Sequence, residues 1–321
     1  MDDIARLEEQ AEQYARDGDT QAAVKCFYDL VAQHARAKNF PKAEAMRERL
    51  MAVDEMALTE IIKAAEIIEA EKSGAIDPNH IERFRALYDR LSEEETNALY
   101  FAQQPLALDA GEVLYRQGDI NTRLFFIQQG QLKLYFSREG QDSLITTLES
   151  GDVAGQDTFF ATTTCTTSLA VQSHAELQVI DNTHLGEWKE SLPALETKLR
   201  EFCQAKDVGK LVTAKGLERR QSRRIKVEGL IVAQMMDTAK ALLGKPFRGD
   251  MADLSNTGLS FYIKATDKAA RMLLGRHLKI RATLEVGGKR QTLERTGATV
   301  AVTPLYFGDF AIHLKFDMPL K

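Results

Sequence analysis

The sequence has few cysteines and no apolar run long enough to cross a membrane. Its three cysteines, Cys26, Cys165 and Cys203, are widely spaced and odd in number. This pattern fits neither a disulfide framework nor a metal cluster, and it indicates a reducing compartment. No apolar stretch approaches the ~18–20 residues of a membrane span, and the acidic, amphipathic N-terminus does not resemble a secretion signal. We therefore expect a cytoplasmic protein without a membrane span.

The sequence motifs of the common enzyme classes are also missing. There is no HExxH, GxSxG, CxxC, phosphate-binding P-loop or GxGxxG. The six histidines are scattered, and His174, His184 and His313 fall in strand or strand-edge contexts, where a structural role is the usual one. We expect no enzymatic activity, no metal and no cofactor.

Residues 2–72 have the apolar periodicity of helices. Within them, two short stretches that begin at Gly18 and Lys38 each combine a turn with an Ala-rich helix start. These stretches loosely resemble tetratricopeptide helical hairpins, although their offset is about twenty residues instead of the usual ~34. A packed helical bundle is one interpretation, and a groove for a partner peptide is the other.

An arginine-rich arm precedes a predicted strand in the C-terminal third. Segment Glu218–Ile225 lies directly before the apolar run Gly229–Ala233, and its arginines are Arg219, Arg220, Arg223 and Arg224. Arginines four residues apart can grip two phosphate groups and still offer flat faces or forks to a base. Arginine is also the commonest side chain to read guanine, through O6 and N7.

A polar turn motif, Asp253–Gly258, follows one strand and a loop later. Asp253 can accept hydrogen bonds from the N1 and N2 donors of guanine, and Ser255 is short enough to sit beneath the ring. Gly258 supplies either a positive φ or a close backbone approach. Arm and turn together suit an anionic ligand that carries guanine.

The two motifs resemble the RxxxR and [D/N]xSxxG signatures of the PilZ family, bacterial receptors for cyclic di-GMP. The arginine signature fits in two registers, Arg219/Arg223 and Arg220/Arg224. We prefer the second register, because the second arginine of the family directly precedes the hydrophobic start of the first strand, here Ile225.

The resemblance implies a role for each motif residue. Arg220 and Arg224 would hold phosphates and guanine edges, with Arg219 and Arg223 assisting. Asp253 and Ser255 would read the second guanine, and Gly258 would shape the turn. The likeness continues to the C-terminus as a six-stranded β-barrel, whose later strands we expect at Leu259–Ile263, Leu278–Val286, Gly297–Val302 and Phe310–Phe316.

Positive charge is concentrated in this C-terminal region. From Glu218 onward 19 Lys and Arg face 10 Asp and Glu, whereas the preceding residues hold 23 against 37. The excess suits an anionic ligand. Nucleic acid is the rival partner, and it would show an affinity that falls steeply with salt; we do not favour it.

Residues 80–205 resemble the cyclic nucleotide-binding domain, a β-roll. The matching stretches are Ala110–Asp119, Leu124–Leu134 and Leu148–Gly155. Their glycines fall at the tight turns of the family, and apolar residues alternate between the turns, as a two-sided roll requires.

The ligand-binding residues of that family are replaced here. The family holds the cyclic phosphate at a helix N-terminus with an arginine, and the ribose hydroxyl with a glutamate. Alignment places Gln156 at the glutamate and Cys165 at the arginine. A cysteine cannot neutralise a phosphate, so we expect a degenerate cyclic nucleotide pocket and a scaffold or docking role.

The fold class that we predict is multidomain α+β, with a helical bundle, a cyclic nucleotide-binding-like β-roll and a PilZ barrel. The predicted boundaries are 1–75 for the helical region, 80–205 for the roll, 206–217 for a linker and 218–321 for the barrel. A β-barrel stands where the activator relatives of the roll carry a DNA-reading domain, which argues against a transcription factor.

The predicted function is that of a bacterial cyclic di-GMP effector. Ligand would order the arginine arm, reorient the barrel relative to the roll and helical region, and signal to a protein partner through the helices. One alternative is a dual sensor that also binds cyclic AMP or cyclic GMP in the roll. Another is a ligand-tuned protein adaptor. The downstream partner, the ligand stoichiometry and the oligomeric state, a homo-oligomer included, stay open.

Overall fold

The computed structural model describes residues 2–138, 140–205, 223–286 and 289–320. Two compact units emerge from the contacts within the chain. The first comprises residues 1–103 with Lys189–Leu199, and the second comprises Gln104–Trp188 with Arg200–Lys321. The predicted linker 206–217 lies outside the described residues, and the predicted domain boundaries stay predictions.

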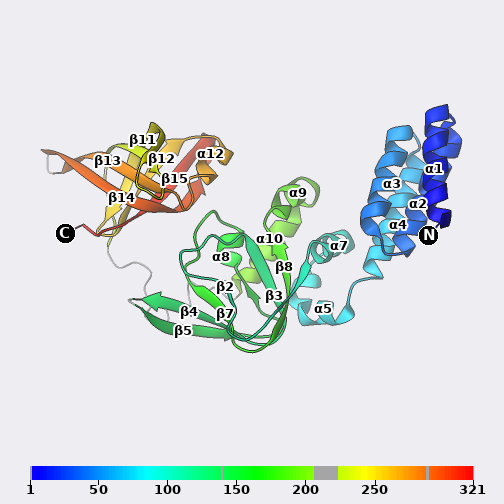
Figure 1. Ribbon diagram of the computed structural model, residues 1–321, viewed down its shortest axis with the longest axis horizontal. Coiled ribbons are helices and arrows are strands. Elements are labelled where there is room, and N and C mark those ends of the chain that lie inside the picture. Colours follow the sequence, from blue (N-terminus) through cyan, green and yellow to red (C-terminus); the bar gives the residue numbers. More distant parts are fainter. Residues whose placement is uncertain (1, 139, 206–222, 287–288, 321) are drawn as a thin grey trace. The chain divides into compact units, whose positions relative to one another are not determined.

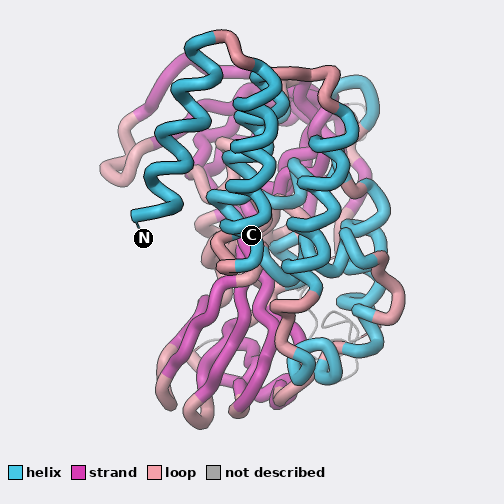
Figure 2. Tube along the Cα trace, turned by 90° about the vertical axis from the view of Figure 1, so that its right-hand side faces the viewer, coloured by secondary structure: helices cyan, strands magenta, loops and turns pink. Residues whose placement is uncertain are grey.

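The first unit begins with a bundle of four helices that run side by side (Figure 1, Figure 2). Their bounds are Asp2–Asp17 (α1), Thr20–Arg36 (α2), Phe40–Val53 (α3) and Leu58–Ser73 (α4). Phe27, Leu30 and Leu50 are fully buried at the centre of the bundle. The expected N-terminal helical bundle is therefore confirmed.

Three shorter helices complete the N-terminal part of this unit, namely Pro78–Arg83 (α5), Arg85–Tyr88 (α6) and Glu93–Phe101 (α7). Helix α7 starts with a capping box, in which the Glu95 amide donates to Ser92 Oγ and the Ser92 amide donates to Glu95 Oε2. Lys198 of helix α10 (Pro193–Gln204) also donates to Glu95 Oε2 at 2.6 Å. Burial opposes ionisation of Glu95, but the bonds from Lys198 and Ser92 outweigh it and lower the pKa.

The second unit contains the β-roll, made of two four-stranded antiparallel sheets in the orders β1-β8-β3-β6 and β2-β7-β4-β5. The strands are Gln104–Leu108 (β1), Val113–Tyr115 (β2), Arg123–Gln129 (β3), Leu132–Arg138 (β4), Gln141–Leu148 (β5), Val153–Ala154 (β6), Ser168–Val171 (β7) and Ala175–Asp181 (β8). Helix Gln156–Phe159 (α8) follows β6, and His184–Ser191 (α9) follows β8. Side chains from both sheets bury a shared core that includes Phe125, Ile127 and Leu169.

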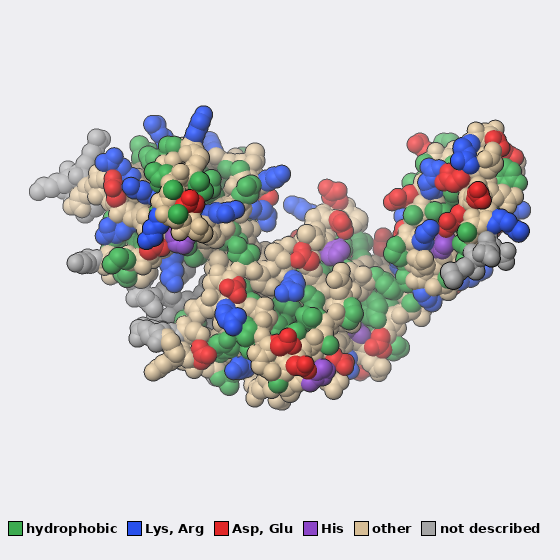
Figure 3. All heavy atoms as spheres, viewed as in Figure 1, with side chains coloured by type: hydrophobic (Ala, Val, Ile, Leu, Met, Phe, Trp, Pro, Cys, Tyr) green, Lys and Arg blue, Asp and Glu red, His purple; other side chains and the backbone are tan. Residues whose placement is uncertain are grey.

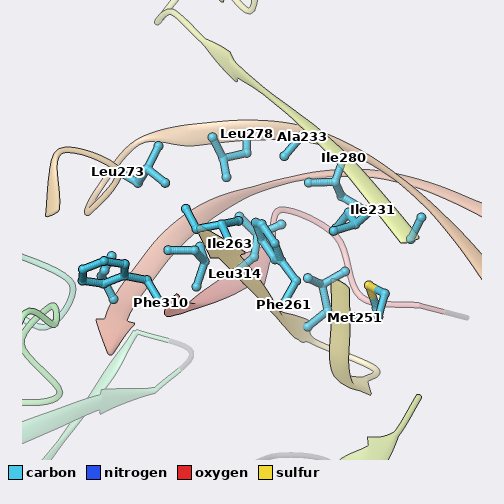
Figure 4. Close-up of a cluster of buried hydrophobic side chains, with 14 of the residues drawn as sticks. Ile231, Ala233, Met251, Phe261, Ile263, Leu273, Leu278, Ile280, Phe310 and Leu314 are labelled. Carbon is cyan, nitrogen blue, oxygen red and sulfur yellow. The ribbon is translucent and has the colours of Figure 1, made fainter. Parts of the chain in front are cut away.

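The C-terminal part is a closed barrel of six antiparallel strands in the order β10-β13-β14-β15-β12-β11, with β11 pairing back to β10. The strands are Gly229–Met236 (β10), Leu242–Ser255 (β11), Gly258–Lys264 (β12), His277–Val286 (β13), Lys289–Pro304 (β14) and Asp309–Phe316 (β15). A short strand, Ile225–Lys226 (β9), pairs with the end of β11, and helix Asp267–Arg271 (α12) follows β12. Alternate side chains such as Ile231, Phe261, Ile280 and Leu314 point inward and fill the barrel (Figure 4).

Within the second unit, strand β14 also bonds to a segment of the roll. The Thr164 amide donates to the Val300 carbonyl at 2.9 Å, and the Val302 amide donates to the Thr162 carbonyl at 2.8 Å. Thr163 and Ala301 form a β-bridge between these two bonds. Roll and barrel therefore share a short antiparallel pairing in addition to the covalent chain.

Candidate functional site

The pairing of β9 with β11 brings the described end of the arginine arm, from Arg223 onward, beside the polar turn. Ile225 lies opposite Leu254, and Lys226 lies opposite Asp253. Arg223 and Arg224 directly precede β9, so both lie at the end of β11 that carries the turn motif. Two motifs that are far apart in the sequence thus meet at one edge of the barrel.

One side-chain contact between the described parts of the motifs joins Arg224 and Asp253. Arg224 Nη1 lies 3.4 Å from both carboxylate oxygens, which is long for a charge-assisted hydrogen bond. The Arg224 side chain is 40% exposed and that of Asp253 is 24% exposed. Asp253 Oδ1 is buried, and among the described residues it accepts no hydrogen bond. The carboxylate thus keeps acceptor capacity for a donor in addition to Arg224.

The turn itself is held by Ser255 and Gly258. Ser255 is buried, and its hydroxyl donates to the Gly258 carbonyl at 3.0 Å. A Cβ added to Gly258 would lie 2.3 Å from the Leu314 carbonyl oxygen, and the φ of Gly258 is not positive. Of the two roles expected for Gly258, the structure shows the close backbone approach. In this arrangement the Ser255 hydroxyl closes the turn, and its contact with a guanine stays a prediction.

The rest of the arm is only partly described. Arg223 is exposed, whereas Arg219 and Arg220 lie outside the described residues, so the register of the arginine motif stays open. Lys226 is a cation that the sequence motifs did not single out, although it faces Asp253 across the β9–β11 pair. Lys226 is the second residue of β9 and follows Arg224 by two positions in the sequence.

The predicted cyclic nucleotide pocket of the roll has a very different character. Gln156 opens helix α8 directly after Gly155, which has a φ of 90° and no room for a Cβ beside the Arg123 carbonyl. Cys165 is only 3% exposed and packs in the core of the roll with Tyr115 and Phe125. The side chain at the predicted arginine position is therefore a core residue.

The charged groups near Cys165 are acidic. Burial, followed by the charges of Asp157 and Asp119, raises the pKa of the Cys165 thiol to about 12. Burial, and then Asp157, also raises the pKa of the neighbouring Tyr115 phenol. Negative carboxylates beside this position would repel the phosphate of a cyclic nucleotide.

The threonines that precede Cys165 could only have offered neutral donors, and their hydroxyls are already engaged. Thr163 and Thr164 donate to the Val300 carbonyl of the barrel at 3.1 and 3.4 Å. Thr162 Oγ1 accepts from Arg271 Nη1 at 2.9 Å. The segment expected to hold a cyclic phosphate instead contacts the barrel.

Comparison with known proteins supports the roll and leaves the barrel unassigned. Residues 105–190 match the family model of the cyclic nucleotide-binding domain. This match confirms the predicted resemblance for that part of the chain. No curated protein matches the chain.

Several solved structures resemble the chain over less than half of its length. The N-terminal domain of a transcriptional regulator from Streptomyces coelicolor A3(2) is 19% identical, covering 43% of this chain and 94% of its own, with a TM-score of 0.35. A cyclic nucleotide-binding domain from Methylobacillus flagellatus KT is 17% identical, covering 43% and 78%, with a TM-score of 0.36. The cyclic di-GMP responsive global regulator CLP of Xanthomonas campestris is 15% identical, covering 39% and 63%, with a TM-score of 0.35.

The residues that the structure describes show neither a candidate membrane span nor a candidate metal cluster. None of the helices placed by the structure is both long and apolar enough to cross a bilayer. The same residues contain no cluster of three His, Cys, Asp or Glu side chains with the geometry to hold a metal ion.

Proposed function

We propose that this protein is a cyclic di-GMP receptor of the PilZ type that signals to a protein partner and is not an enzyme. The observation that carries the proposal is the β9–β11 pairing, which brings Arg224 within 3.4 Å of Asp253. Cyclic di-GMP presents two phosphates and two guanines. Exposed guanidinium groups suit its phosphates and the O6/N7 edges, and a carboxylate suits the N1/N2 edge.

The geometry of the arm and turn supports an exchange of partners when ligand binds. The Arg224–Asp253 contact is long and partly exposed, so breaking it costs little, about 0–1 kcal/mol. A phosphate can then take the guanidinium, while guanine N1–H and N2–H donate to Asp253. Each group exchanges a weak contact for a better matched one, which provides the differential affinity that a switch needs.

The connection between roll and barrel supports the proposed output. The arginine arm leads from the last helices of the roll region into β9, so it is the covalent link to the barrel. We infer that ligand fixes this link and turns the barrel relative to the roll and the helical region, where a protein partner docks. Any such turn must strain or break the pairing of Thr163 with Ala301.

Hydrogen exchange with and without cyclic di-GMP tests this mechanism. Exchange should slow across residues 216–226 and 253–260. It should also change at the Thr164 and Val302 amides, whose hydrogen bonds between roll and barrel report the position of the barrel. Slowing at the turn alone, with no change in the arm or at the Val302 amide, would leave ligand binding intact but remove the switch.

The family match over residues 105–190 favours a second candidate, a roll that binds cyclic AMP or cyclic GMP. The buried Cys165 and the nearby Asp157 and Asp119 weigh against it. We therefore propose that the roll is a scaffold. Low-micromolar cyclic AMP or cyclic GMP should leave the melting temperature unchanged, because only a ligand well above its Kd stabilises a protein measurably. A shift of several degrees would establish the dual sensor.

A further inference from the structure

The hairpin between β14 and β15 ends in three exposed apolar side chains. Leu305 is 44% exposed, Tyr306 is 85% exposed and Phe307 is 100% exposed. We call residues 305–308 the aromatic apex. Phe and Tyr are among the side chains that gain most from leaving water. The two consecutive aromatic rings at the tip of the hairpin therefore lack the stabilisation that burial gives to the apolar side chains of the barrel core.

The backbone of the aromatic apex carries a second, independent cost. Phe307 has a φ of 59° and a ψ of 28°, in the left-handed region that a side chain with a Cβ disfavours. The rings of Tyr306 and Phe307 lie 6.4 Å apart at a tilt of 52°. Glycine or asparagine would form this turn with less strain and less exposed apolar surface. Because Phe307 combines a strained backbone with a fully exposed ring, we take its side chain to have a function of its own.

Basic residues lie at the base of the aromatic apex. Lys264 is exposed and faces Asp309 across the β12–β15 pair, directly below the turn. The Ala265 amide donates to the Gly308 carbonyl at 3.3 Å, so the start of the segment carrying the exposed Lys268 is tied to the apex. The barrel region as a whole has 19 basic against 10 acidic residues from Glu218 onward. Lysines and arginines surround the barrel on the face drawn in Figure 3.

From these observations we infer that the aromatic apex is a peripheral anchor that inserts into an anionic phospholipid surface. Amphipathic tyrosine rings and nearby lysines suit the headgroup region, where apolar rings enter the acyl boundary and cations meet lipid phosphates. Two aromatic side chains bury about 150–250 Å² each. That area is far below the ~800 Å² that each partner contributes to a stable protein interface, whereas a bilayer requires no complementary shape.

The proposed anchor goes beyond the nucleotide site and lies apart from it. Strand β12 starts at Gly258, beside the polar turn, and ends at Lys264, beside the aromatic apex. Seven strand residues span roughly 20 Å. Ligand and lipid would therefore bind at opposite ends of one rigid strand, and the barrel could hold both at once.

Sedimentation of the full-length protein with phosphatidylglycerol vesicles and with phosphatidylcholine vesicles tests the anchor. The wild type should bind the anionic vesicles, and Tyr306→Ser/Phe307→Asn should weaken that binding at least tenfold. Asparagine tolerates the left-handed backbone, so this double variant should fold. Lys264→Ala should weaken binding about fivefold, as expected for one lysine at an anionic surface.

The matched control removes two exposed apolar side chains elsewhere on the barrel. Leu230→Thr/Val232→Thr changes two exposed side chains of β10, keeps every charge, and should stay within twofold of the wild type. This comparison also separates insertion from simple attraction of the arginine arm to the vesicles, because both double variants keep the arm. Equal binding of the apex variant and the wild type would overturn the proposal, as would a wild type that ignores anionic vesicles.

A fluorescent reporter gives a second, structural test. The chain has one tryptophan, the buried Trp188. In a Trp188→Phe/Phe307→Trp variant, emission comes only from the aromatic apex. Phosphatidylglycerol vesicles should shift that emission to the blue, whereas cyclic di-GMP alone should not. Absence of a shift in a variant that still sediments with vesicles would place the contact elsewhere and contradict the inference.

Discussion

The proposed ligand site of the barrel and the predicted nucleotide pocket of the roll have surroundings of opposite character. In the barrel, Arg224 is 40% exposed and Asp253 keeps a buried acceptor oxygen. In the roll, Cys165 is buried in the hydrophobic core beside two carboxylates. The roll nevertheless retains the fold of its family, including the left-handed Gly155 before helix α8. A backbone architecture therefore does not by itself specify the chemistry of a site, and function must be inferred from the side chains at that site.

The largest expected effect concerns the chemical reactivity of Cys165. Its pKa of about 12 lies above the ordinary value of 9.0, mainly because burial disfavours the thiolate. At pH 8 the folded protein should therefore alkylate at Cys165 roughly a thousandfold more slowly than the unfolded chain, because only the thiolate reacts. Iodoacetamide labelling of a Cys26→Ser/Cys203→Ala variant measures this rate. Fast labelling would show that Cys165 lies in an open pocket, which would contradict the contrast between a buried position in the roll and an exposed site in the barrel.

The same raised pKa predicts a dependence of stability on pH. A thiol whose pKa is higher in the folded state contributes stability that is fully present below pH 9 and is lost as the pH rises toward 12. Cys165→Ala should remove this loss. The difference in the free energy of unfolding between the wild type and Cys165→Ala should therefore shrink as the pH rises above 9, which denaturation curves at several pH values would measure.

Restoring the arginine of the cyclic nucleotide family should damage the roll. Cys165→Arg places a guanidinium in the core cluster with Tyr115 and Phe125. Even with Asp157 nearby, we expect a loss of about 3 kcal/mol or more in the free energy of unfolding. Cys165→Ala should cost about 1–2 kcal/mol by comparison, as for a small cavity. A stable Cys165→Arg protein that binds cyclic AMP would show that the position still belongs to a ligand pocket.

Removing the arm cation should weaken cyclic di-GMP binding to the barrel. Arg224→Ala is expected to raise the Kd about 10- to 100-fold, because a charge-assisted contact is lost. Arg224→Lys should recover only part of the affinity, since lysine keeps the charge but lacks the planar fork. The exposed Arg248 on β11 supplies the matched control, and Arg248→Ala should leave the Kd unchanged within twofold. If Arg224→Ala and Arg248→Ala weaken binding equally, the loss of affinity reflects net charge and not a specific contact of Arg224.

A smaller effect is expected at the carboxylate. Asp253→Ala removes contacts to one guanine edge and leaves the phosphates held, so the Kd should rise about 3- to 10-fold. Asp250→Ala, at an exposed position three residues earlier on the same strand, should have no effect. A tighter complex in Asp253→Ala would mean that the Arg224–Asp253 contact inhibits the arm and that Asp253 does not read guanine.

Much of this arrangement could be predicted from local sequence patterns. The helical bundle, the roll and the six-stranded barrel are confirmed. These features depend on short-range periodicity, turn residues and caps. The bounds of strand β11 could not be predicted in this way, because the strand contains Gly244, Pro246 and Gly249, and glycine and proline at such spacing are typical of a loop. Its pairing with β10 and β12, interrupted by bulges, overrides those local signals.

The chemistry of the two sites was predictable to different depths. In the barrel, the two sequence motifs predicted that the arm and the turn share one site, and the β9–β11 pairing agrees with that expectation. In the roll, alignment indicates which residue replaces the family arginine but not what surrounds it. The effect of Asp119 on Cys165, and the engagement of Thr163 by Val300, join residues far apart in the chain. Only the packed structure reveals such contacts.

Calorimetric titration of cyclic di-GMP into the wild type and into Arg220→Ala/Arg224→Ala tests the central claim most directly. The wild type should bind in the micromolar range or tighter, and the double variant should give no heat of binding at the same concentrations. A matched variant, Arg248→Ala/Arg281→Ala, removes two exposed barrel arginines outside the motifs and should titrate like the wild type. Wild-type heats in Arg220→Ala/Arg224→Ala would contradict the assignment of the arm and turn as the cyclic di-GMP site.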